Sequence, residues 1–138
     1  MSDMQYSIAP VGVVRSALAN LDDAPRQGDE GAPEAWLDLR AEFAPALAGI
    51  VAGDELIVLT WLHRAEREIL QVHPRGDLNK PLTGVFATRS PDRPNPIGMH
   101  RVPVLEIDGT RVRVAQLEAI DGTPIVDIKP VLGGIDER

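Results

Sequence analysis

A short stretch in the second half of the chain combines concentrated positive charge with rigidity. Residues 84–101 read GVFATRSPDRPNPIGMHR, with three prolines inside six positions. Proline lacks an N–H and fixes φ, and the residue before it is pushed to an extended conformation, so we expect a stiff loop. Arg89, Arg93 and Arg101 against Asp92 leave an excess of two positive charges. Such a loop suits anion binding, and a rigid connector with solvated arginines is the alternative.

Several common kinds of chemistry are absent from the sequence. The chain contains no cysteine, which excludes a thiolate nucleophile and a Cys-ligated zinc site. It has no glycine-rich dinucleotide fingerprint, no Walker A loop and no G-x-S-x-G nucleophile turn. The three histidines, His63, His73 and His100, lack the spacing of metal ligands. We therefore expect neither a Rossmann nucleotide site nor a bound metal.

The elements that must position this loop are predicted to be short strands. A continuous apolar run over residues 55–61 has strand length and is expected to cross the core. A brief helix is expected from Pro45 to about Gly49, and a loop without periodicity over residues 19–33. Residues 66–72 favour a strand, although 65–70 would also tolerate a helical turn. Further strands are expected at residues 11–15 (within the apolar run 8–14), 36–40, 102–107, 111–117 and 125–128.

Two Asp-Gly pairs mark turns between these strands. Asp108-Gly109 separates two β-rich runs and predicts a hairpin, because glycine accepts the positive φ of a tight turn. Asp121-Gly122 precedes the last apolar run in the same way. Short strands about ten residues apart with little helix predict an all-β barrel or sandwich, in one domain over residues 1–138. No signal peptide or membrane-spanning run is evident, so we expect a soluble, cytoplasmic protein.

The arginine- and proline-rich stretch and four other segments together resemble one known family. Residues 84–98, GVFATRSPDRPNPIG, are similar to the signature of the TsaA-like (TrmO) methyltransferases. The resemblance covers residues 8–132. Its other anchors follow in family order: Gly12-Val13-Val14-Arg15-Ser16, Pro25-Arg26-Gln27, Trp61-Leu62-His63 and residues 121–130, DGTPIVDIKP.

The resemblance implies a mainly β fold, a single-sheeted β-barrel with one or two short helices and no Rossmann domain. It also implies a homodimer that binds S-adenosylmethionine near the subunit interface and N-methylates threonylcarbamoyl-adenosine beside the anticodon of tRNA. Carried over by position, the expected cofactor contacts are Pro25, Arg26, Gln27, His63, Arg64, Arg89, Met99, Asp121, Gly122, Thr123 and Pro124. Acceptor contacts are expected at Arg93, Asn95 and Arg101.

Methyl transfer from a sulfonium needs mainly alignment of donor and acceptor, so it requires no protein nucleophile and no metal. Arg89 or Arg26 could bind the cofactor carboxylate as a fork. His63, at a strand end, is the candidate general base or else a partly buried structural histidine. The 121–124 turn could read the adenine edge through its backbone or serve only as a turn. Met99 is expected to pack against the cofactor or the barrel wall.

The acceptor stays open at this point. The net charge of −7 counts against tRNA, whose binding rests largely on contacts between phosphates and clustered Lys and Arg. A small-molecule acceptor and a non-catalytic S-adenosylmethionine-binding module are the two alternatives. A basic patch formed by Arg64, Arg89, Arg93 and Arg101 would favour tRNA.

Overall fold

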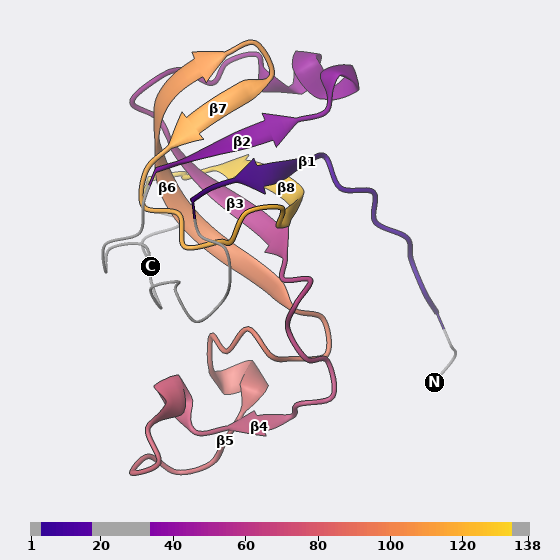
Figure 1. Cartoon of the computed structure of the whole chain (residues 1–138), viewed down its shortest axis with the longest axis vertical. Helices are drawn as coiled ribbons and strands as arrows, with labels where there is room; N and C mark the ends of the chain where they lie inside the picture. Colours follow the sequence, from indigo (N-terminus) through magenta and orange to yellow (C-terminus); the bar gives the residue numbers. More distant parts are fainter. Residues whose placement is uncertain (1–3, 18–33, 134–138) are drawn as a thin grey trace.

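Six antiparallel strands close into one barrel. The computed structural model describes residues 4–17 and 34–133 (Figure 1). Around the barrel the order is β1-β2-β7-β6-β3-β8, and β1 pairs with β8 to close it. The strands are β1 (Gly12–Arg15), β2 (Ala35–Leu39), β3 (Glu55–Trp61), β6 (Ile97–Asp108), β7 (Arg111–Val114) and β8 (Pro124–Pro130). The expected mainly β, single-sheeted barrel is confirmed.

The barrel interior is filled by aliphatic side chains from alternate strand positions. Leu37 on β2, Val58 on β3 and Val102 on β6 are fully buried, and so are Val112 on β7 and Ile125 on β8. Successive side chains of a strand point to opposite faces, which explains why residues between these positions are more exposed. Valine and isoleucine fit this pleated surface and supply the core that the few aromatic residues cannot.

The described helical segments are all short 3-10 turns. They are η3 (Ala41–Leu47), η4 (Pro74–Gly76) and η5 (Val85–Ala87). The helix expected from Pro45 was placed four residues too late, because η3 begins at Ala41 and contains Pro45. Its N-terminal turn closes through the Phe43 N–H and the Arg40 carbonyl, upstream of the proline, so the missing N–H of Pro45 does not interrupt it.

Two further strand boundaries differ from those expected. Over residues 66–72 only β4 (Gln71–Val72) is a strand, paired with β5 (Thr83–Gly84) in a small separate sheet. The stiff loop was expected to continue to Arg101, but β6 begins at Ile97, directly after the last proline of the stretch. Pairing with β3, from Trp61 opposite Ile97 to Glu55 opposite Pro103, draws residues 97–101 into the barrel.

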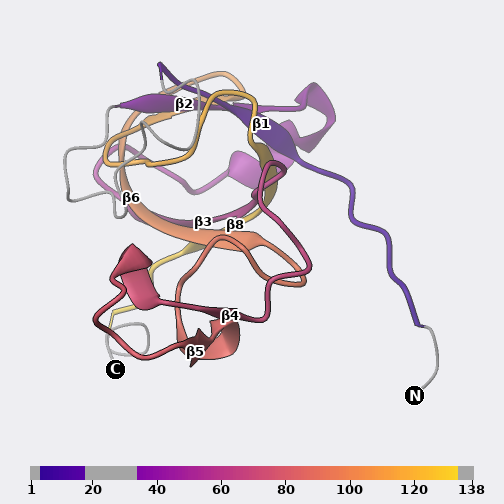
Figure 2. The ribbon, with the colours of Figure 1, turned by 60° about the horizontal axis from the view of Figure 1, so that its bottom comes forward.

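The connection from β3 to β6 forms an excursion that we call the arm, residues 62–96. The arm carries β4, η4, β5 and η5, and both views place it outside the barrel, joined to the ends of β3 and β6 (Figures 1 and 2). It carries six Lys and Arg against four Asp and Glu, a net charge of +2. Because the whole chain has a net charge of −7, the residues outside the arm have a net charge of −9. The arm is therefore the cationic part of an acidic chain.

At the N-terminal side of β1, residues 4–10 extend away from the barrel and are exposed (Figure 1). Within the described ranges, no helix has the length and apolar character needed to cross a bilayer.

Candidate functional site

Three of the five connections between barrel strands leave the same end of the barrel, which we call the loop end. Because neighbouring strands are antiparallel, β1, β3 and β7 all finish there, and β2, β6 and β8 all begin there. The connections at this end are β1 to β2, the arm, and residues 115–123 between β7 and β8. Every expected cofactor contact inside the described ranges lies in these connections or in the first residues of the strands that follow them.

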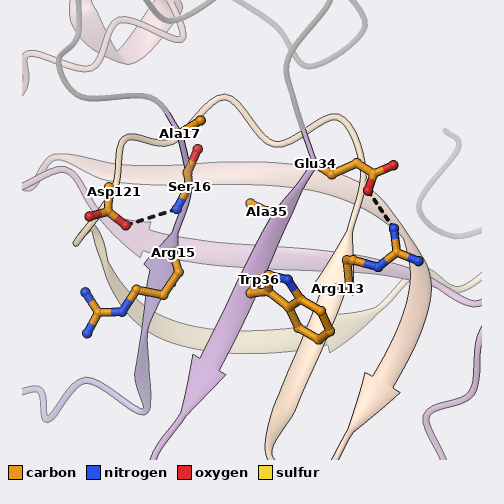
Figure 3. Close-up of a pocket in the computed structure, with 8 residues that line it drawn as sticks. All are labelled: Arg15, Ser16, Ala17, Glu34, Ala35, Trp36, Arg113 and Asp121. Carbon is orange, nitrogen blue, oxygen red and sulfur yellow. Dashed lines mark hydrogen bonds and ion pairs between the residues drawn. The ribbon is translucent and has the colours of Figure 1, made fainter.

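The first connection is described only at its two margins. Pro25, Arg26 and Gln27 lie outside the described residues. At the margins, Ser16 and Glu34 help to line an open pocket of about 340 Å³ at the loop end (Figure 3). Its other lining residues are Arg15, Ala17, Ala35, Trp36, Arg113 and Asp121.

Most charges around this pocket are paired within the chain. The Arg113 guanidinium donates to Glu34 at 2.5 Å and to Glu106 at 2.9 Å, and its hydrogen bonds to Glu106 and Glu34 raise the pKa of Arg113. Arg15 lies 3.8 Å from Asp38. The pocket's arginines are thus partly neutralised by the chain's own carboxylates, which makes this face a poor site for a free anion.

The 121–124 turn is anchored on β1. The Gly122 N–H donates to the Val14 carbonyl at 2.7 Å, and the Ser16 N–H donates to the Asp121 carboxylate at 3.0 Å (Figure 3). The Thr123 hydroxyl is buried and donates to the Ile120 carbonyl. The N–H groups of Gly122 and Thr123 are used internally, and the Thr123 carbonyl accepts from the Val14 N–H at 2.9 Å. The turn therefore has the carbonyls of Asp121 and Gly122 and the second Asp121 oxygen to offer a ligand's donors. An exocyclic amine fits this set.

Gly122 adopts φ +85, a left-handed conformation that side chains with a Cβ rarely take. A Cβ there would meet no atom within 4 Å, so the only cost of Gly122→Ala is backbone strain. We expect the variant to unfold with a free energy lower by about 1 kcal/mol. Chemical denaturation measures this difference. An unchanged midpoint would show that the turn relaxes to a different conformation without cost.

His63 and Arg64 form the turn just beyond β3, and both are exposed. The alternative of a partly buried structural histidine is therefore wrong. Among the described residues His63 has no hydrogen-bond or ion-pair partner, so its imidazole is available to a ligand. Met99 lies on the outer face of β6 and is 48% exposed, which rules out a role as core filler.

Arg89 differs from the other described arginines. It is exposed on the arm and has no hydrogen bond, ion pair or ring contact with any part of the chain that the structure describes. By contrast, Arg40 pairs with Glu42 and Arg111 stacks on Trp36, 4.7 Å from the ring centroid. An arginine that has no partner in its own chain can bind a ligand carboxylate without first breaking an internal contact.

The three expected acceptor contacts are engaged within the chain. Arg93 donates to the carbonyls of Val85 at 2.6 Å, Thr88 at 2.5 Å and Ser90 at 2.8 Å. Asn95 accepts from Arg67. Arg101 binds both oxygens of Glu55, and its hydrogen bond lowers the pKa of that carboxyl. The structure therefore uses these side chains to build the arm and brace the barrel, and a direct contact with an acceptor stays a prediction.

The sequence did not indicate two features that support the candidate site. Arg67 stacks over Trp61, 5.1 Å from the ring centroid, and its Nε donates to the Pro94 carbonyl at 2.7 Å, which joins the two ends of the arm. Thr60 and His100, both buried, form a polar cluster at the loop end with the partly buried Glu118. Their partners lie 18 to 40 residues apart in the sequence, so no local pattern could have indicated these contacts.

A family model described as the tRNA-methyltransferase O N-terminal domain matches residues 13–137. A probable S-adenosyl-L-methionine-binding protein of Methanothermobacter thermautotrophicus is 46% identical over 99% of this chain and 97% of its own length. An S-adenosyl-L-methionine-binding protein of Archaeoglobus fulgidus is 41% identical over 94% of this chain and 91% of its own length.

Solved structures agree with the sequence comparisons. A crystal structure of TrmO covers the whole chain with a TM-score of 0.80 at 30% identity. The TrmO of Pseudomonas aeruginosa covers 98% of the chain with a TM-score of 0.78 at 29% identity. In both cases the chain spans 60% of the length of the solved TrmO chain.

Proposed function

Since the chain belongs to the family of tRNA-methyltransferase O N-terminal domains, we propose that it binds S-adenosylmethionine at the loop end and transfers the methyl group to a nitrogen of a modified tRNA adenosine. The observation that carries the proposal is that the 63–64 turn, the arm with its unpaired Arg89 and the 121–124 turn all follow strands that finish at one end of the barrel. Relatives matched over nearly their full length are named for binding this cofactor.

The residues at the loop end fit the functional groups of the cofactor. Arg89 would hold its carboxylate with two parallel N–H groups, and the carbonyls of Asp121 and Gly122 would accept hydrogen bonds from its adenine amine. The exposed face of Met99 offers a soft apolar contact beside them. Gly122 leaves open space where a side chain would otherwise stand, which permits close approach to the backbone.

When bound, S-adenosylmethionine would supply an activated methyl group, and transfer of that group to the acceptor nitrogen would break the sulfur–carbon bond and leave a neutral thioether. The chain's task is to hold the acceptor in line with that bond and to keep competing water out. The methylated nitrogen must also release its proton. His63 is exposed, has no internal partner within the described ranges and lies in the same turn as Arg64, so it is our candidate for accepting that proton.

The charge distribution supports a nucleic-acid acceptor in spite of the acidic total. The arm carries a net charge of +2 where the remaining residues carry −9, so phosphates would be drawn to the arm and repelled elsewhere. The expected patch is nevertheless reassigned. Arg93 and Arg101 are held by internal bonds, so among the exposed cations of the arm we expect Arg89 and Lys80 to face phosphates.

We also propose that the active form is a homodimer. Large apolar side chains are exposed on the arm and at the start of β6: Leu70, Leu78, Leu82, Phe86, Ile97 and Met99. Exposed apolar area of this kind is typical of an interface between subunits. Light scattering coupled to size-exclusion chromatography measures the mass, for which we expect twice the 15.0 kDa of the chain. A mass of one chain at micromolar concentration would contradict the proposal.

The acceptor is tested by incubating the protein with radiolabelled S-adenosylmethionine and total tRNA from two strains, one with and one without the threonylcarbamoyl modification. We expect label only in tRNA that carries the modification. Label in both pools would overturn the choice of nucleoside. No label in either, with the cofactor still bound, would favour a small-molecule acceptor or a non-catalytic binding module.

A further inference from the structure

A buried polar cluster lies inside the barrel at the loop end. The Thr60 hydroxyl and His100 Nε2 are 2.7 Å apart, and His100 Nδ1 lies 2.6 Å from a carboxylate oxygen of Glu118. Thr60 is fully buried, the His100 side chain is 4% exposed, and the Glu118 side chain is partly buried at 20% exposure. Burying polar groups in an aliphatic interior is costly unless each is hydrogen-bonded, so this cluster needs an explanation.

The hydrogen bonds fix how the imidazole is oriented. An ionised carboxylate can only accept, so Nδ1 carries the proton shared with Glu118. In the neutral ring Nε2 is then an acceptor, and the Thr60 hydroxyl donates to it. Within the described residues no buried side-chain nitrogen or oxygen lacks a partner, so the three groups satisfy one another.

The order hydroxyl, imidazole, carboxylate is also that of an activated nucleophile, but here the hydroxyl cannot be reached. Thr60 has no exposed surface, and Gly98 closes over it: a Cβ at Gly98 would lie 2.6 Å from the Thr60 hydroxyl oxygen and 2.9 Å from His100 Nε2. No acceptor can approach the oxygen without opening the barrel. The cluster therefore acts through the backbone segments that it joins.

Those segments carry the candidate site. His100 is adjacent to Met99 on β6, and Glu118 lies three residues before Asp121. The 121–124 turn is itself bonded to β1, through Gly122 and Val14 and through Ser16 and Asp121. The segment that leads into the turn is tied to β6 at two points. The Ala115 N–H donates to the Pro103 carbonyl, and three residues later the Glu118 carboxylate bonds to His100 Nδ1.

We propose that His100 is a positioning residue for cofactor binding. Through Glu118 it fixes the 121–124 turn relative to Met99 and β6, while Thr60 serves mainly to orient the imidazole ring. The inference rests on the proposed binding of S-adenosylmethionine at the loop end. It adds a specific requirement: affinity depends on the bond between His100 and Glu118 and far less on the bond between His100 and Thr60.

Two amide substitutions separate the two bonds. The side-chain amide of His100→Asn places a donor where Nδ1 lies, so it retains the bond to Glu118 and loses the bond to Thr60. His100→Gln reaches the Nε2 position, so it retains the bond to Thr60 and loses the bond to Glu118. Thr60→Val removes the bond to Thr60 by changing the partner of His100, and Glu118→Ala removes the bond to Glu118 in the same way. Each bond is thus probed twice, and one poorly folding variant does not prevent the test.

The affinity for S-adenosylmethionine is measured by calorimetry for the wild type and the four variants, together with each melting temperature. We expect all four variants to melt below the wild type. We expect His100→Gln and Glu118→Ala to bind at least tenfold more weakly, with His100→Asn and Thr60→Val within about threefold of the wild type. A merely structural cluster would instead lose affinity in proportion to the drop in melting temperature, whichever bond is removed.

The possible failures are distinguishable. Wild-type protein that binds no S-adenosylmethionine would overturn the proposed function and this inference with it. Normal wild-type binding with four variants that bind alike, or whose affinities only follow their melting temperatures, would overturn this inference alone and leave the proposed function intact.

Discussion

Arg93→Ala is expected to loosen the arm without unfolding the barrel. The guanidinium donates to three backbone carbonyls between Val85 and Ser90, and a hydrogen bond from a charged donor contributes about 1.5–3 kcal/mol. Because the three bonds share one side chain, we expect a loss of about 2–4 kcal/mol in the local stability of residues 85–95. Amide hydrogen exchange measures this loss as faster exchange over that segment.

The barrel strands serve as the internal reference for this experiment. β3 and β6 pair along seven positions, from Glu55 opposite Pro103 to Trp61 opposite Ile97, and need nothing from Arg93. Their amide exchange is expected to be unchanged. Arg93→Lys keeps the charge but not the planar fork, so we expect most of the loosening to persist. Equal acceleration in β3 and β6 would show that the arm and the barrel unfold as one unit.

Arg89→Ala is expected to weaken S-adenosylmethionine binding by at least about 1 kcal/mol, roughly fivefold in Kd. The reason is that Arg89 has no partner among the described residues, so its full hydrogen-bonding capacity is available to the cofactor carboxylate. For the same reason its removal should leave the melting temperature and the exchange of residues 85–95 unchanged. Calorimetric titration measures the affinity.

Two variants control this prediction. Arg40→Ala removes an exposed arginine at the opposite end of the barrel, paired there with Glu42, and is expected to bind like the wild type. Arg89→Lys keeps a point charge and should recover part of the affinity. Wild-type affinity in Arg89→Ala would remove Arg89 from the site and shift the carboxylate contact to Arg26, which lies outside the described residues.

Local sequence patterns were sufficient to predict those strands and turns that neighbouring residues determine. The apolar run 55–61 matches β3. Asp108 ends β6, and Gly109 lies in the turn before β7 with φ +61, as a tight turn requires. The family resemblance placed the candidate residues. The antiparallel order of the strands then puts the connections and strand beginnings that carry the described cofactor candidates at one end of the barrel.

The remaining features depend on contacts that are distant in sequence. Strand β6 begins at Ile97 because β3 supplies its pairing partners, which the proline-rich sequence itself does not indicate. The sequence predicted a solvated or ligand-binding role for Arg93. Its actual partners are backbone carbonyls, which every residue type has, so the sequence could not indicate them. The sequence also could not indicate the bond between His100 and Glu118, because the strand pattern around each position does not specify which polar residue stands there.

Hydrogen exchange with and without S-adenosylmethionine tests the central claim most directly, because it detects binding and locates it. We predict slower exchange around His63, Arg89 and the 121–124 turn, with no change in the two connections at the opposite end, residues 40–54 and 109–110. An absence of protection at saturating cofactor, or protection confined to the opposite end, would contradict the account.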